Sequence, residues 1–95
     1  MPTLKPPPDQ LDGAGVLLWA YSPDQPFFIM NDSHGAPHQA IHGFVVCRYE
    51  AENIFYRFSC DLGWNVVNDM DYASLEEAVN SAHGLSGQAL TWYQK

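Results

Sequence analysis

Three of the four histidines fall in one segment at even four-residue spacing, namely His34, His38 and His42. Zinc takes three or four nitrogen, sulfur or oxygen ligands that converge on one point, and two histidines four positions apart on a helix supply such a pair. Pro37 is a suitable first residue for a short helix that would place His38 and His42 on one face. His34 cannot share that helix, because Gly35 and Pro37 intervene.

A second interpretation of this segment starts a strand near Ala40. His42 then points to the same side as Phe44 and Val46, away from His38. Since no fourth ligand and no further metal-binding motif accompanies the histidines, we expect no metal site and no cofactor, with His38 and His42 as the alternative ligands.

The two cysteines, Cys47 and Cys60, are the candidate nucleophiles. In the hairpin register given below they share one face of a sheet but lie about 13 Å apart at 3.3 Å per residue. That separation exceeds the Cα limit of about 7 Å for a disulfide. No histidine is expected beside either thiol, so we expect both to act as small buried hydrophobic residues.

Two close pairs of carboxylates, Asp69 with Asp71 and Glu50 with Glu52, have the composition of an acid–base pair. Each pair lies at a strand end or a turn, where exposed acids are ordinary, and no glycine-rich phosphate loop accompanies them. We therefore expect no catalytic residue and no catalytic activity.

The two arginines are placed by alternation on one outer face of the predicted sheet, with two phenylalanines beside them. Arg48 and Arg57 are diagonal neighbours about 7–8 Å apart, flanked by Phe44 and Phe55. Arginine with aromatic residues is typical of interface hot spots, so this face is a candidate binding surface. The alternative is a solvated face on which the arginines pair with Glu50 or other acids and the first hairpin covers the phenylalanines.

A second candidate surface is acidic. Between Ser59 and Gln94 the chain has no lysine or arginine and carries five acids: Asp61, Asp69, Asp71, Glu76 and Glu77. If the last hairpin and the start of the helix lie together, these acids form one patch that would attract a basic partner.

The elements that must position these residues are mostly strands. Apolar runs predict strands over 15–22 and 27–31, joined as a hairpin by a proline turn, and over 44–50, 53–60 and 88–94. In the central hairpin Cys47 lies opposite Tyr56, and Gly63 takes the left-handed position of the next turn, so that Trp64 and Val66 join the core face.

One helix is predicted, over about Ser74–His83. Ser74 is a good N-cap, and Glu77 completes a capping box. Gly84 follows as the residue that ends the helix. The fold class is therefore α+β, an antiparallel sheet of about five to six strands with one helix from the C-terminal half packed on one face.

Composition limits the functions further. Residues 1–13 are a proline-rich, flexible lead-in and residues 14–95 one domain. The net charge of -7 argues against nucleic acids and anionic membranes. The first residues lack the apolar core of a signal peptide, and no run reaches the ~18 apolar residues of a membrane span, so we expect a cytoplasmic protein.

These observations favour a small, acidic, non-catalytic protein-binding domain, with a basic protein as partner, as in immunity proteins or antitoxins that neutralise toxins. A homodimer is compatible with this function. The alternative is a small-ligand or metal-binding domain, with an enzyme as one form of it, that uses the segment His34–His42 and the face of Arg48 and Arg57.

Overall fold

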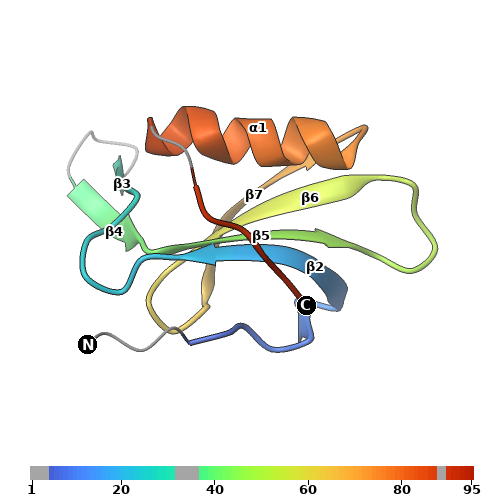
Figure 1. Cartoon of the computed structure of the whole chain (residues 1–95), viewed down its shortest axis with the longest axis horizontal. Coiled ribbons are helices and arrows are strands. Elements are labelled where there is room, and N and C mark those ends of the chain that lie inside the picture. The colour runs from blue at the N-terminus through green and yellow to red at the C-terminus, as the bar shows by residue number, and fades with distance from the viewer. Residues whose placement is uncertain (1–4, 32–36, 88–89) are drawn as a thin grey trace.

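The computed structural model describes residues 5–31, 37–87 and 90–95, with only the backbone for residues 31, 37 and 38. Its main layer is an antiparallel sheet in the order β1-β2-β5-β6-β7, with β8 also paired to β2, and a single helix lies across it (Figure 1). The strands of this sheet are β1 (Gln10–Leu11), β2 (Ala14–Tyr21), β5 (Gly43–Arg48), β6 (Phe55–Cys60), β7 (Val66–Tyr72) and β8 (Tyr93–Gln94). A separate hairpin joins β3 (Phe28–Asn31) to β4 (Pro37–Ile41), and the helix is α1 (Leu75–Ser86). The predicted α+β class is confirmed.

The central hairpin has the predicted register, with Cys47 opposite Tyr56. Alternation along β5 and β6 then sends one set of side chains into a core formed with β2 and the β6–β7 turn. Its buried members are Leu11, Ala14, Val16, Trp19, Val45, Cys47, Phe58, Cys60 and Trp64. The predicted core face is confirmed for most of its members, including Trp64, and Val66 packs against it. Ile54, which was predicted to lie on the same face, is 36% exposed.

The opposite face of β5 and β6 is also covered. Phe44 and Val46 are fully buried, and Phe44 packs with Ile41 and with Ala82 of α1. The prediction of one open, outer sheet face is therefore wrong for the middle of β5. Two layers, α1 and the segment around β3 and β4, pack on the side that the alternation alone left open.

The first predicted hairpin is also corrected. β2 pairs with β5 rather than with β3, and β3 pairs with β4 in a sheet of its own. Phe27 and Phe28 nevertheless stack on Phe44 at 5.0 and 5.9 Å between ring centroids. The alternative in which this part of the chain covers a phenylalanine of the sheet is thus correct for Phe44.

Helix α1 begins as predicted and ends later. The Ser74 hydroxyl accepts a hydrogen bond from the backbone N–H of Glu77 at 3.2 Å, which confirms the N-cap. Gly84 lies inside the helix, and the left-handed residue that ends it is Gly87, with φ of 72°. The helix meets the sheet through the small residues Ala78 and Ala82, which allow a close approach.

Both ends of the described chain pack on the sheet. β1 and β8 pair with the outer edge of β2, and Trp64 Nε1 donates a 2.8 Å hydrogen bond to the carbonyl oxygen of Lys5. Pro7 is buried. Within the predicted lead-in, Lys5, Pro7 and strand β1 therefore contact the rest of the domain. Within residues 5–31, 37–87 and 90–95, no helix has the length and apolar character needed to cross a membrane.

Candidate functional site

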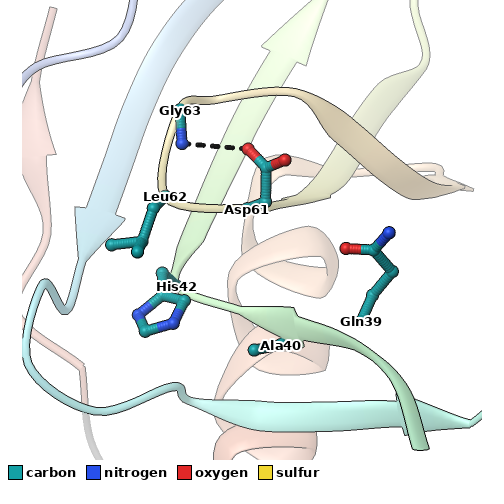
Figure 2. A pocket seen from close by; sticks show the side chains of 6 residues that line it. All are labelled: Gln39, Ala40, His42, Asp61, Leu62 and Gly63. Carbon is teal, nitrogen blue, oxygen red and sulfur yellow. Dashed lines mark hydrogen bonds between the residues drawn. The ribbon is translucent and has the colours of Figure 1, made fainter.

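A pocket of about 300 Å³ lies between the β4–β5 junction and the β6–β7 turn. Figure 2 shows His42 and Ala40 on one side of it and the turn residues Asp61, Leu62 and Gly63 on the other. The lining residues are Gln39, Ala40, His42, Asp61, Leu62 and Gly63. His42 and Asp61 were singled out from the sequence. Gln39 and Leu62 were not, because only the pairing of β5 with β6 brings these two segments together.

The carboxylate of Asp61 organises its own turn. Its Oδ1 accepts hydrogen bonds from the backbone N–H groups of Gly63 and Asn65, both at 2.9 Å, and its Oδ2 accepts one from the Asn65 side chain at 3.1 Å. Partial burial alone would raise the pKa of Asp61, but these hydrogen bonds and the nearby His42 outweigh it and lower the pKa below its usual value. The anionic form therefore holds the turn that forms one wall of the pocket.

The left-handed residue of this turn differs from the prediction. Trp64 has φ of 64°, whereas Gly63 is not among the residues with positive φ. A tryptophan in this region is uncommon and carries strain. The contacts of its buried ring, which reach Lys5, Trp19 and Tyr21, hold it there.

Replacing Asp61 with asparagine is expected to destabilise the protein by about 1 kcal/mol at pH 7. Asparagine keeps one oxygen for the backbone N–H groups of Gly63 and Asn65 but loses the charge-assisted part of those hydrogen bonds, and its NH2 group cannot accept from the Asn65 side chain. A carboxyl whose pKa is lowered by folding contributes stability above its unfolded pKa and loses it as the pH falls through the folded value. The difference between wild type and Asp61→Asn should thus begin to shrink as the pH falls below the ordinary value of 3.8, and its charge-dependent part should be gone once the pH lies below the lower folded pKa.

Urea unfolding of both proteins across this pH range checks the expectation. Asp24→Asn, at an exposed position in the β2–β3 connection, is the matched control and should change stability by less than about 0.5 kcal/mol. A difference for Asp61→Asn that stays constant with pH would contradict the role given to the charge.

His42 is held on two sides. Its backbone N–H donates to the carbonyl oxygen of Cys60 at 2.9 Å, and its Nδ1 lies 2.7 Å from the carbonyl oxygen of Ser22. Since a carbonyl oxygen only accepts, Nδ1 carries a proton. In the neutral ring Nε2 is then the nitrogen left to accept a hydrogen bond or bind a metal. The Asp61 carboxylate, on the other side of the pocket, already accepts hydrogen bonds from Gly63 and Asn65 of its own turn.

The short helix that would pair His38 with His42 does not form. Residues 37–41 are strand β4, so the two Cα atoms are separated by about 13 Å of extended chain rather than about 6 Å of helix. His34 lies outside the described residues, as does the side chain of His38. Across the side chains that the structure describes, no group of three or more histidine, cysteine, aspartate or glutamate residues is placed to hold a metal ion.

Cys47 and Cys60 are free and fully buried, which confirms their predicted role as small core residues. Burial raises the pKa of each thiol to about 12, helped by Asp12 near Cys47 and by Asp61 near Cys60. Both side chains are therefore thiols at neutral pH, and neither is a ready nucleophile.

The predicted arginine–phenylalanine face is divided by the fold. Arg57 is 4% exposed and Phe44 is fully buried, so neither reaches a surface partner. Arg48 is exposed, and Phe55 is half-buried. The expected pair of exposed arginines is wrong because α1 covers the middle of β6, which the alternation of the strand does not reveal.

Under α1 the Arg57 guanidinium is held by neutral oxygens. It donates to Tyr72 Oη, Ser81 Oγ and Asn68 Oδ1, each at 3.2 Å. Burial lowers its pKa, and Tyr72 opposes that shift. Arg57 thus ties β6 to β7 and to α1.

Four acids of the predicted patch are exposed but lie on two sides of the sheet, and the fifth, Asp61, is half-buried. Asp69 pairs with Phe58 and Asp71 with Tyr56, which places both carboxylates on the face away from α1. Glu76 and Glu77 lie in the first turn of α1, where the helix dipole favours them. Asp61 is engaged at the far end of β6, so the five acids do not form one patch.

Opposite charge is scarce around these acids. Within the described part of the chain the one ion pair joins Lys95 and Asp9 at 3.1 Å. Asp69 and Asp71 therefore present uncompensated negative charge along β7. A third acidic group nearby is Glu52, which accepts hydrogen bonds from the Tyr56 hydroxyl at 3.2 and 3.3 Å.

No protein-family model, no curated protein and no solved structure matches this chain.

Proposed function

We propose that this protein is a protein-binding domain that recognises a basic partner through the acidic segment from β7 to the first turn of α1. The observation that supports it is the exposure of Asp69, Asp71, Glu76 and Glu77 without an ion-pair partner among the described residues. Exposed negative charge without neighbouring positive charge speeds association with a positively charged protein.

The distribution of cations adds support. The chain carries four lysines and arginines against eleven acids. One of the four, Arg57, is buried under α1, and a second, Lys95, is paired with Asp9. The exposed surface therefore has a larger excess of negative over positive charge than the net charge of -7 suggests. Such a surface favours a basic protein over an acidic one as the partner.

The proposal is tested by association kinetics. The partner is first captured with wild-type protein by cross-linking in cells and then purified. Exchanging Asp69 and Asp71 for asparagine should leave the free energy of unfolding within about 0.5 kcal/mol of wild type, because both side chains are exposed. The same exchange should slow association by about tenfold at low ionic strength, and the loss should shrink as salt is added.

The double variant Asp24→Asn/Glu50→Gln removes the same charge from two other exposed positions, one in the β2–β3 and one in the β5–β6 connection. It should slow association much less than the exchange in β7. If the two double variants associate at the wild-type rate and salt has no effect, the acidic segment is not the binding surface.

A further inference from the structure

The two edges of the main sheet differ in whether further strands pair with them. At one edge, β1 and β8 cover β2, through Gln10 opposite Gly15 and Leu18 opposite Gln94. At the other edge lies β7, which has seven residues and pairs only with β6 among the described residues. An edge strand of this length presents a row of unpaired backbone N–H and C=O groups on which another extended chain can pair.

The side chains of β7 indicate what kind of chain fits. Asp69 and Asp71 lie two positions apart on the face away from α1, about 7 Å from each other along the strand. Met70, which is 49% exposed, lies between them on the other face, opposite Arg57. A strand added beside β7 would place every second side chain next to the aspartates and the intervening one next to Met70.

A second copy of this protein fits poorly at the same edge. In an antiparallel pair, residues that lie opposite each other share a face, so two β7 strands related by a twofold axis would put Asp69 or Asp71 opposite or diagonal to the same aspartates of the other copy. Like charges in those positions are destabilising. The edge is thus protected against self-pairing and open to a basic chain.

We propose that the β7 edge binds an extended segment of the basic partner as an additional strand, with lysine or arginine at alternate positions beside Asp69 and Asp71 and an apolar residue beside Met70. This inference rests on the proposed function and adds its binding mode: backbone hydrogen bonds supply affinity, and the two aspartates select the charge pattern.

The test uses a capped peptide of alternating lysine and valine, Lys-Val-Lys-Val-Lys-Val-Lys, and two N-methylated forms of it. In a strand, the N–H groups of alternate residues point to opposite edges. Methylating either all lysine or all valine nitrogens therefore blocks only one edge of the peptide. One form should bind at least about tenfold more weakly than the unmodified peptide, and the other should bind with a similar Kd.

Two further measurements complete the test. The unmodified peptide should slow hydrogen exchange at alternate amides of β7, and Asp69→Asn/Asp71→Asn should weaken its binding more than Asp24→Asn/Glu50→Gln does. Equal binding of all three peptides overturns strand pairing and leaves the basic-partner proposal standing, since charge alone then explains the affinity. Failure of every peptide to bind at low salt also overturns strand pairing, whereas the basic-partner proposal is decided separately by association rates with the captured partner.

Discussion

Replacing Phe44 with alanine is expected to destabilise the protein by about 3–5 kcal/mol, a large share of the roughly 5–15 kcal/mol that holds a domain of this size folded. The ring is fully buried, stacks on Phe27 and Phe28, and packs with Ile41 and Ala82 of α1. Truncation leaves a cavity between the sheet and two layers that cannot collapse fully. Thermal unfolding should show a fall in Tm of more than about 10 °C.

The matched control is Ile29→Ala in β3, where the side chain is 46% exposed. It should cost less than about 1 kcal/mol, because little of its surface is withdrawn from water. The result also distinguishes a Phe44 that is buried under other layers from a Phe44 that lies on an exposed binding face. If Phe44 belonged to an exposed binding face, its replacement would leave Tm unchanged, and that result would contradict the buried position described above.

Replacing Gly43 with alanine is expected to destabilise the protein by about 1–3 kcal/mol through overpacking. An added Cβ would lie 2.5 Å from Cζ3 of Trp64 and 3.0 Å from its Cη2. The indole has little freedom to retreat, because its Nε1 donates to Lys5 and its ring stacks on Tyr21 with centroids 5.0 Å apart. Urea unfolding measures the loss as a lower midpoint at unchanged slope.

Gly84→Ala is the control, and it is expected to stabilise the protein where Gly43→Ala destabilises it. Gly84 lies within α1, and an added Cβ there would meet no atom within 4 Å. Gly84→Ala should therefore stabilise the protein by about 0.5–1 kcal/mol, because alanine loses less conformational entropy in a helix. In a Trp64→Leu background, Gly43→Ala should cost less than in wild type. An equal cost in both backgrounds would show that Trp64 is not the obstacle.

The local features of the fold could be predicted because their causes lie within a few residues of chain. Alternation of apolar side chains set Cys47 opposite Tyr56, and Ser74 with Glu77 marked the start of α1. The end of α1 was misplaced because two glycines, Gly84 and Gly87, are close together, and only Gly87 adopts the left-handed conformation. Sequence spacing does not say which of two glycines the helix passes through.

The candidate site depended on contacts between distant segments. The sequence identified Asp69 and Asp71 as exposed acids and separated the core side of the central hairpin from its other side. It could not say what covers that other side, because alternation defines two faces but not the layers that pack on them. The tertiary structure buried Phe44 and Arg57 there, joined His42 to the turn of Asp61, and left β7 as the unpaired edge among the described residues. Each of these outcomes follows from packing between segments far apart in the chain, whose energy no short stretch of sequence contains.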